Sequence, residues 1–235
     1  MIYIHYVRLS LQKDIDMQHF QYWMSQMPEE IKMKINRFYH WQDALRCLAG
    51  NVLVMQAFRR FTETGNILHH LVTNEFGKPA LKGLQYNFNV SHSEELVICA
   101  VNTEGAIGVD AENIRPINVA DYSSQLLPEE RSRILSHTEP DAAFFDYWTE
   151  KEAVMKASGK GLGLGLDSFL VSDHQTYADQ RQWYLLSVDL WENYAVHIAA
   201  DHFLSATSCS IAEQFYFARG YKDPSGDRLI YSPVN

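Results

Sequence analysis

Hydrophobic and polar positions along the chain follow two different periods, which predicts a mixture of strands and helices. The start, MIYIHYVRL, alternates and predicts a first strand. Residues 17–26 have a helical pattern, and Pro28 stands where a short basic helix with the sequence EEIKMKINRFYH would begin. The segment WQDALRCLAGNVLVMQAFRRF has apolar residues at helical spacing and predicts a long core helix.

The chain from residue 75 onward continues this mixture. The turn EFGKPAL precedes YNFNVSHSEELVICAV, which predicts strand, turn and strand, and GAIGVDAENIRP predicts a strand that stops at Pro116. Residues 117–137 predict two short helices divided by Pro128, and a helix over about 140–157 ends in the glycine-rich SGKGLGLGL. Four later segments have the pattern of strands: SFLVSD, WYLLSVDL, NYAVHIAADH and FYFA.

Each half therefore contains strands and one long helix, which predicts an α+β protein built from two similar lobes. No convincing residue-level repeat accompanies this similarity. We expect an N-terminal lobe over residues 1–104, a C-terminal lobe over 105–221 and a loosely ordered tail over 222–235. The join falls close to IGVDAE, and ligand sites often form between lobes.

Composition narrows the class of protein. With 235 residues and no apolar run of the roughly 18 residues that a membrane span requires, we expect a soluble protein with its own core. The start lacks a signal-peptide pattern, and Cys47, Cys99 and Cys209 lie far apart in apolar segments, which favours reduced thiols in a cytoplasm.

Charge argues against a general nucleic-acid or anionic-membrane binder, because the net charge is −9 and such binding rests on an excess of Lys and Arg. A local anion site stays open, since four cations gather in one short stretch: Lys32, Lys34, Arg37 and Arg46.

Two pairs of charged residues are the candidates for chemistry. Asp110 and Glu112 of IGVDAE would point to the same side of a strand, because the side-chain period of a strand is two. Glu152 and Lys156 are four apart on the helix that contains WTEKEAVMK. Taken alone, the first pair is more often an ordinary surface feature, and the second is an ordinary helix ion pair.

Convergence of the two pairs would change this interpretation. Three carboxylates with open coordination positions are what Mg²⁺ uses when it also holds substrate phosphates, and Lys156 would then pair with phosphate oxygens. Such a set serves phosphoryl transfer, in which a metal neutralises developing charge while a base takes a proton from the attacking hydroxyl. Spacing alone does not establish that Glu152 meets Asp110 and Glu112.

Four motifs in a fixed order extend this hypothesis. IGVDAE is followed about forty residues later by WTEKEAVMK, and GKP and NVSHS stand upstream, after RFYHWQDALRCLAGNVL. Together they closely resemble the 4'-phosphopantetheinyl transferases of the surfactin-synthetase-activating type, over about residues 1–220. The resemblance implies a pseudo-twofold pair of α/β lobes with coenzyme A in the cleft between them.

The activity that this resemblance implies is Mg²⁺-dependent transfer of 4'-phosphopantetheine from coenzyme A to a serine of an apo carrier protein. Adenosine 3',5'-bisphosphate would be released, and Mn²⁺ would be a tolerated substitute for Mg²⁺. The carriers would belong to peptide, polyketide or fatty-acid synthesis, including antibiotic biosynthesis, and the pseudo-dimeric chain would act as a monomer.

Roles for individual residues follow from the same resemblance. Asp110, Glu112 and Glu152 would ligate Mg²⁺, and Glu152 would also deprotonate the acceptor serine. Lys156 and Lys151 would contact the pyrophosphate, and Arg46 and His92 the ribose 3'-phosphate. Lys78, Pro79 and Ser91 would lie along the adenosine. Lys34, with Lys32, would help to neutralise the phosphate charge. The basic helix has one extra residue between Pro28 and Arg37 relative to the family pattern.

Apolar residues after the IGVDAE strand are candidates for carrier contact, or else for inward packing: Ile117, Val119, Leu126 and Leu127. Two alternatives to the transferase are a catalytically silent coenzyme A- or carrier-binding module and another metal-dependent phosphoester enzyme. A serine nucleophile in SHS is disfavoured, because neighbouring strand side chains diverge and no nucleophile-elbow motif surrounds it.

Overall fold

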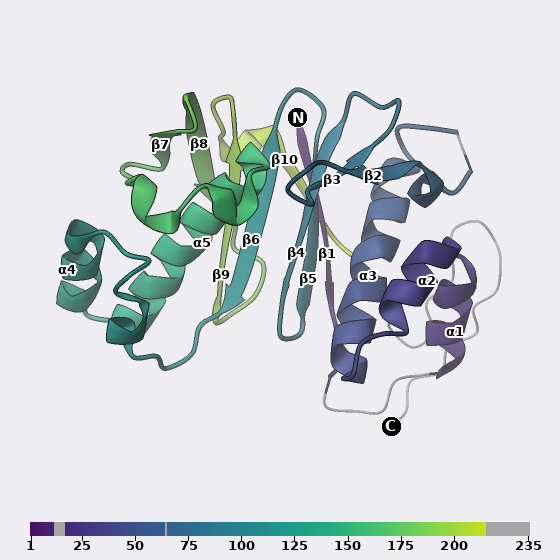
Figure 1. The fold of residues 1–235 in the computed structure, drawn as a ribbon, viewed down its shortest axis with the longest axis horizontal. Helices are drawn as coiled ribbons and strands as arrows, with labels where there is room; N and C mark the ends of the chain where they lie inside the picture. Colours follow the sequence, from purple (N-terminus) through teal and green to yellow (C-terminus); the bar gives the residue numbers. More distant parts are fainter. Residues whose placement is uncertain (12–16, 64, 215–235) are drawn as a thin grey trace.

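The protein is an α+β structure in which two four-stranded sheets lie between two groups of helices (Figure 1). The computed structural model describes residues 1–11, 17–63 and 65–214. Five α-helices occur in these ranges: α1 (Met17–Ser25), α2 (Glu29–Ile35), α3 (Trp41–Phe58), α4 (Pro128–Ser136) and α5 (Pro140–Ser158). No helix in this part of the chain is long and apolar enough to cross a membrane.

The first sheet has the order β10-β1-β5-β4, with β10 parallel to β1 and the other neighbours antiparallel. Its strands are β1 (Ile2–Arg8), β4 (Asn87–Ser93), β5 (Leu96–Asn102) and β10 (Cys209–Glu213). The second sheet has the order β6-β9-β8-β7 and is antiparallel. Its strands are β6 (Ile107–Asn113), β7 (Gln175–Ala178), β8 (Arg181–Ser187) and β9 (Tyr194–Ala200).

Smaller elements complete the structure. A two-stranded hairpin pairs β2 (Leu71–Thr73) with β3 (Pro79–Leu81). Short 3₁₀ helices stand at Ile67–His70, Val119–Tyr122, Gly161–Gly163, Leu166–Ser168 and Ala206–Ser208.

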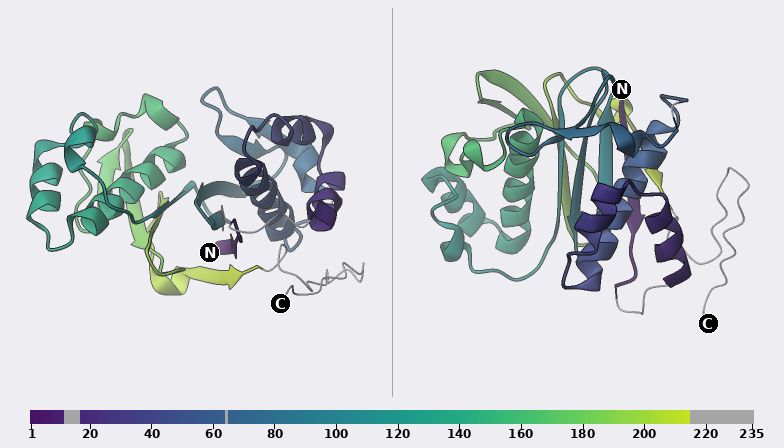
Figure 2. Two further views of the ribbon diagram at one scale, coloured as in Figure 1. Left: turned by 90° about the horizontal axis from the view of Figure 1, so that it is seen from below. Right: turned by 45° about the vertical axis from the view of Figure 1, so that its right-hand side comes forward.

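Alternation along β5 explains how the layers pack. All seven β5 residues are buried, because one face of the strand meets α3 and the other meets the second sheet. Val97, Cys99 and Val101 belong to the apolar cluster that contains the α3 side chains, whereas Leu96 and Ile98 belong to a cluster shared with β6 and β9. Figure 2 shows the result from below, with helices outside and strands between them.

The edge strands β4 and β6 lie side by side without belonging to one sheet. On its other side, β6 packs so closely on α5 that a Cβ at Gly108 would lie 2.0 Å from the Ala153 carbonyl oxygen and 2.4 Å from the Ala157 nitrogen. The glycine of IGVDAE therefore lets the strand that carries Asp110 and Glu112 approach the helix that carries Glu152.

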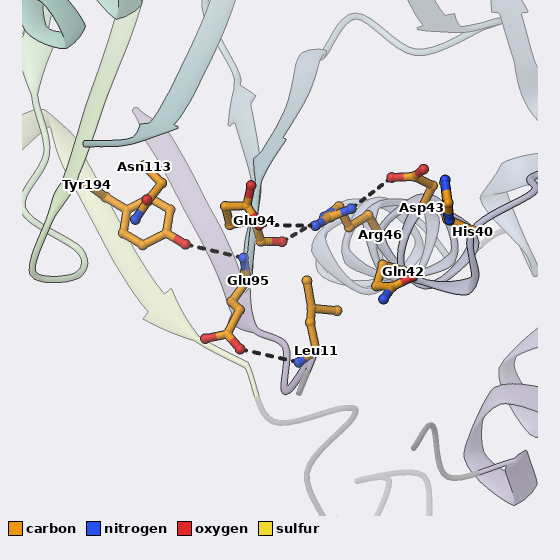
Figure 3. A pocket seen from close by; sticks show the side chains of 9 residues that line it. All are labelled: Leu11, His40, Gln42, Asp43, Arg46, Glu94, Glu95, Asn113 and Tyr194. Carbon is orange, nitrogen blue, oxygen red and sulfur yellow. Dashed lines mark hydrogen bonds and ion pairs between the residues drawn. The ribbon is translucent and has the colours of Figure 1, made fainter. Parts of the chain in front are cut away.

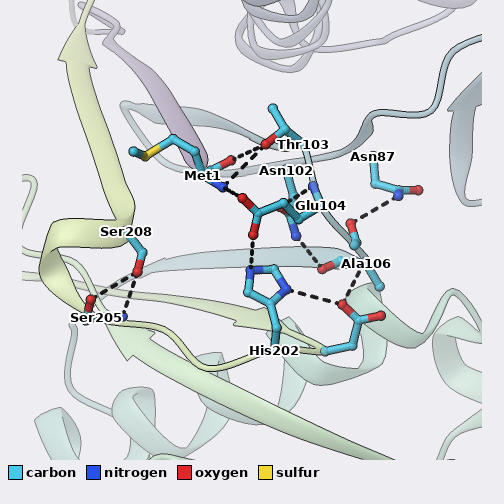
Figure 4. A network of polar contacts seen from close by, with 11 residues as sticks. Met1, Asn87, Asn102, Thr103, Glu104, Ala106, His202, Ser205 and Ser208 are labelled. Atoms are coloured by element: carbon cyan, nitrogen blue, oxygen red, sulfur yellow. Dashed lines mark hydrogen bonds and ion pairs between the residues drawn. The ribbon is translucent and has the colours of Figure 1, made fainter.

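The β5–β6 and β9–β10 connections, which link the two sheets, contact each other (Figure 4). The Glu104 carboxylate accepts from the N-terminal amine of Met1 at 2.7 Å and lies 4.0 Å from Nε2 of His202. Asp201 accepts from the Ala106 amide at 3.0 Å, and a Cβ at Gly105 would lie 2.2 Å from its carboxylate. Contacts between the β5–β6 and β9–β10 connections thus help to hold the two sheets together.

Most predicted elements are present, but the strand predicted at SFLVSD is wrong. Phe169 and Val171 are buried beneath α5, yet this segment forms only an isolated bridge from Ser172 to Gln175, and β7 begins at Gln175. Its apolar side chains therefore reflect packing rather than strand pairing. The first helix predicted after Pro116 is a 3₁₀ turn, and FYFA and the tail from residue 222 lie outside the described residues.

Candidate active site

Residues from β4, β6 and α5 meet around one cavity. Asp110 and Glu112 project from the same side of β6, and Glu152 and Lys156 are one turn apart on α5. The cavity has a volume of about 330 Å³ and is lined by Val90, Ser91, His92, Asp110, Glu112, Trp148, Glu152 and Lys156. The convergence that spacing left open is therefore present.

Two serines on β4 orient the carboxylates of β6. The Ser91 hydroxyl donates to Oδ1 of Asp110 at 2.9 Å, and the Ser93 hydroxyl donates to Oε2 of Glu112 at 2.8 Å. Ser93 Oγ also accepts from the Asn113 amide at 3.1 Å. Because alternate β4 residues face β6, the NVSHS motif supplies one hydroxyl to each carboxylate.

Asp110 is the most buried of the three carboxylates, with 4% of its surface exposed. The Lys156 ammonium donates to its Oδ1 at 2.5 Å and to the Ser91 hydroxyl at 3.0 Å. Its second oxygen, Oδ2, is buried and has no hydrogen-bond partner within the described part of the chain. A buried carboxylate oxygen without a donor is costly, so this atom is suited to a ligand that brings positive charge.

The other two carboxylates are partly buried beside this charge. Burial raises the pKa of Glu112 and of Glu152, and the negative charge of Asp110 raises both further. Lys156 stands among the three carboxylates and Arg115 lies 3.7 Å from Glu112, so one negative charge remains in excess, which a cation would compensate.

The donor set fits Mg²⁺, because all three side chains offer hard carboxylate oxygens and one of those oxygens is unsatisfied. Within residues 1–11, 17–63 and 65–214, no three His, Cys, Asp or Glu side chains already have the geometry of a metal site. Lys156 provides the positive charge nearest to Asp110 in this structure.

A second cavity, of about 540 Å³, shares Val90 and His92 with the first. Lys34 and Arg46 supply positive charge to its lining and Glu30 supplies one negative charge, whereas most of the other lining residues are apolar, including Ile31, Phe38, Val54, Leu71, Val72, Pro79 and Phe88. Partial burial, followed by the charges of Arg46 and Lys156, lowers the pKa of His92. Largely apolar walls with two cationic side chains suit a nucleotide.

The third cavity is larger, at about 610 Å³, but its walls are acidic (Figure 3). Arg46 lines this cavity as well as the second one, and it donates to Asp43 at 2.7 Å and to the Glu94 carbonyl at 2.7 Å. Glu95 adds a further carboxylate. These walls would repel a phosphate group, so the neighbouring cavities are better candidates for nucleotide binding despite their smaller volumes.

Two lysines proposed from the resemblance lie elsewhere. Lys151 is buried and pairs with the buried Glu130 of α4, at 2.5 and 2.6 Å from its two oxygens. Lys78 directs its ammonium to the main-chain carbonyls of Ile107 and Ala157, at 3.0 and 2.9 Å. Lys151 does not line the cavity around Asp110, and Lys78 lines neither that cavity nor the second one.

The candidates for carrier contact divide into two groups. Val119 and Leu126 are buried in an apolar cluster with α5 residues, so these two side chains pack into the core. Ile117 and Leu127 are half-buried.

Sequence reasoning missed Ser93, Asn89 and Trp148 as parts of this site. Asn89 Oδ1 accepts from the Val109 amide at 2.8 Å, so Asn89, Ser91 and Ser93 all reach β6 from alternate positions of β4. Their period of two was visible in NVSHS, but the partner strand was not. Trp148 lies one turn before Glu152, a position that helical spacing would have included.

Comparisons with known proteins agree with this geometry. Residues 15–104 match the model of the 4'-phosphopantetheinyl transferase N-terminal domain, and residues 106–207 match that of the 4'-phosphopantetheinyl transferase superfamily. The chain is 37% identical over 155 residues to the 4'-phosphopantetheinyl transferase Sfp of Bacillus subtilis (strain 168), covering 65% of this chain and 69% of that protein.

Other relatives carry the same name. The 4'-phosphopantetheinyl transferase gsp of Aneurinibacillus migulanus is 30% identical over 166 residues, which cover 69% of each chain. The 4'-phosphopantetheinyl transferase HetI of Nostoc sp. is 34% identical over 141 residues, covering 55% of this chain and 58% of that protein. The chain therefore belongs to the 4'-phosphopantetheinyl transferase family, is of the Sfp type, and is a transferase.

Proposed function

We propose that this transferase moves the 4'-phosphopantetheine group of coenzyme A to a serine hydroxyl of an apo carrier protein and releases adenosine 3',5'-bisphosphate. We further propose that the reaction depends on Mg²⁺. The observation that carries this proposal is the cavity in which Asp110, Glu112, Glu152 and Lys156 converge, with Asp110 Oδ2 buried and unsatisfied.

In this proposal the three carboxylates hold the cation, with Ser91 and Ser93 fixing the orientation of two of them. When bound, Mg²⁺ would supply neutralisation of the charge that grows on the pyrophosphate oxygens. Lys156 would pair with the same oxygens, because its ammonium stands at the cavity beside Asp110. Glu152 lines the same cavity and would accept the proton of the attacking serine.

The adjoining cavity of about 540 Å³ would receive the adenosine and its phosphates. Its apolar wall, which includes Pro79, would contact the base, and Ser91 lies between Val90 and His92, the two residues that line both cavities. Lys34, Arg46 and His92 would meet the ribose 3'-phosphate and neighbouring charge, because their side chains lie on its lining.

The wider setting is proposed from the same resemblance. The two sheets with their helices would be the two similar lobes, over residues 1–104 and 105–221 except that β10 returns to the first sheet, with coenzyme A in the cleft between them. The chain would act as a monomer on carriers of peptide, polyketide or fatty-acid synthesis, with Ile117 and Leu127 as contact candidates. Free thiols at Cys47, Cys99 and Cys209 support a cytoplasmic location.

The test is the intact mass of an apo peptidyl carrier domain incubated with coenzyme A, Mg²⁺ and the protein. We expect a mass gain of one phosphopantetheine group. Glu152→Gln and an excess of chelator should each abolish that gain, whereas Glu129→Gln, at an exposed position of α4, should leave it unchanged.

Several outcomes would contradict the proposal. Consumption of coenzyme A without any carrier would indicate a phosphoester hydrolase instead. Unchanged turnover by Glu152→Gln, or in the presence of chelator, would remove the roles proposed for Glu152 and the cation. An absence of modification across peptidyl, acyl and aryl carriers would contradict the substrate assignment.

A further inference from the structure

The loop between β2 and β3 reaches across β4 and β5 toward the end of α5 (Figure 1). Asn74 Nδ2 donates to the Gly159 carbonyl at 2.8 Å, immediately after the helix. Gly159 has φ +77°, and a Cβ there would lie 3.2 Å from both Asn74 Nδ2 and Lys78 Cδ. The loop that contains GKP is therefore fitted closely onto the C-terminus of α5.

Lys78 makes the second connection. Its ammonium donates to the Ala157 carbonyl at 2.9 Å and to the Ile107 carbonyl at 3.0 Å. Ala157 is in the last turn of α5, whereas Ile107 begins β6, an edge strand of the second sheet. One side chain thus joins the helix that carries Glu152 and Lys156 to the strand that carries Asp110 and Glu112.

The environment suits this role. The last carbonyls of a helix lack intrahelical partners and carry partial negative charge, so a cation there is favourable. The loop itself is braced, because Asn74 Oδ1 accepts from the amides of Phe76 and Lys78 at 3.0 and 2.8 Å. Burial lowers the pKa of Lys78 to about 8, as expected for an ammonium removed from water.

We infer that Lys78 is a positioning residue that holds the end of α5 against β6, and through them the carboxylates and Lys156, rather than a residue that binds the nucleotide. Both of its acceptors, Ile107 and Ala157, are main-chain oxygens of the expected C-terminal lobe, and Lys156 is adjacent to Ala157. The kinetic part of this inference rests on the function proposed above.

The test compares Lys78→Met with Asn74→Ala, which removes the neighbouring contact without changing charge. Lys82→Met, at an exposed lysine four residues away, is the matched control. Amide hydrogen exchange of residues 154–158 and of the start of β6 reports directly, without substrate, whether the joint between the end of α5 and β6 is held. Calorimetry with adenosine 3',5'-bisphosphate reports nucleotide binding, and steady-state kinetics separate kcat from KM.

We expect faster exchange at both segments for Lys78→Met and Asn74→Ala, and a kcat reduced by about tenfold to a hundredfold for Lys78→Met. Affinity for adenosine 3',5'-bisphosphate and the KM for coenzyme A should stay within about twofold of wild type. The control should match wild type throughout.

Unchanged exchange together with a tenfold or greater loss of nucleotide affinity would overturn the inference and assign Lys78 to the ligand. Exchange and kcat equal to those of the control would also overturn it. If wild-type protein turned over no carrier, the function proposed above would fail, but the exchange measurement would still decide whether Lys78 holds the joint.

Discussion

At the scale of single residues, the candidate site depends on hydroxyl groups as much as on charges. Glu112 is less buried than Asp110, the other carboxylate of β6. The Ser93 hydroxyl donates to it at 2.8 Å. Groups that orient a ligand side chain contribute strongly to metal affinity, even though they do not touch the metal. Ser93 should therefore influence the proposed cation site without being a ligand.

For Ser93→Ala we predict binding of Mn²⁺ to be weaker by about tenfold to a hundredfold, because Glu112 loses the donor that orients it. Ser93→Thr keeps the hydroxyl and should stay close to wild type, as should Ser136→Ala at an exposed serine of α4. Electron paramagnetic resonance of free Mn²⁺ during a titration measures this affinity. Identical affinities for wild type and Ser93→Ala would contradict the orienting role.

At the scale of elements, α4 is joined to α5 by a buried ion pair. Lys151 and Glu130 are 1% and 0% exposed, and Glu130 Oε2 also accepts from the Leu127 amide at 2.9 Å. Burial lowers the pKa of Lys151, and the Glu130 carboxylate opposes that change. Because both charges are removed from water, each depends on the other.

We predict that Lys151→Met lowers the free energy of unfolding by about 3–5 kcal/mol, since it leaves the Glu130 charge buried and unpaired. The double variant Glu130→Met with Lys151→Met should be more stable than either single variant. Lys160→Met, just beyond α5, should cost less than about 0.5 kcal/mol. Urea unfolding of Lys151→Met, Glu130→Met, the double variant and Lys160→Met measures these free energies. A loss under about 1 kcal/mol for Lys151→Met would show that folding does not depend on the ion pair.

At the scale of the whole molecule, β1 is central because it pairs with both β5 and β10, which brings residues 209–213 back to the first sheet. His5 lies on this strand opposite Cys99 and Ala212, and its Nδ1 is buried without a partner in the described part of the chain. Burial, and secondarily the charge of Arg60, lowers the pKa of His5 from 6.5 to about 4.

This shift predicts a loss of stability in mild acid. Above pH 6.5 His5 is neutral in both states, whereas between pH 6.5 and about pH 4 chiefly the unfolded chain binds the proton, so the folded state loses stability as the pH falls. We expect His5→Val to avoid about 2 kcal/mol of the loss that wild type shows between roughly pH 7 and pH 5. Urea unfolding at both pH values tests this; equal losses for the two proteins would contradict it.

Local periodicity determined much of the molecule. The spacing of apolar residues predicts α3 and α5 correctly, because a helix presents one face every 3.6 residues whatever its neighbours are. The period of two in IGVDAE places Asp110 and Glu112 together, and the order of the motifs indicates the family. These features depend on backbone geometry and on the residues themselves, which the sequence contains completely.

Only the tertiary structure decided which partner each side chain meets. The resemblance implies that Lys78 lies along the adenosine and Lys151 at the pyrophosphate. Lys78 instead reaches the end of α5 and the start of β6, and Lys151 pairs with the buried Glu130. SFLVSD has the composition of a strand but packs beneath α5. Burial of apolar faces across the whole chain selects which strands and helices become neighbours, and no local pattern contains that information.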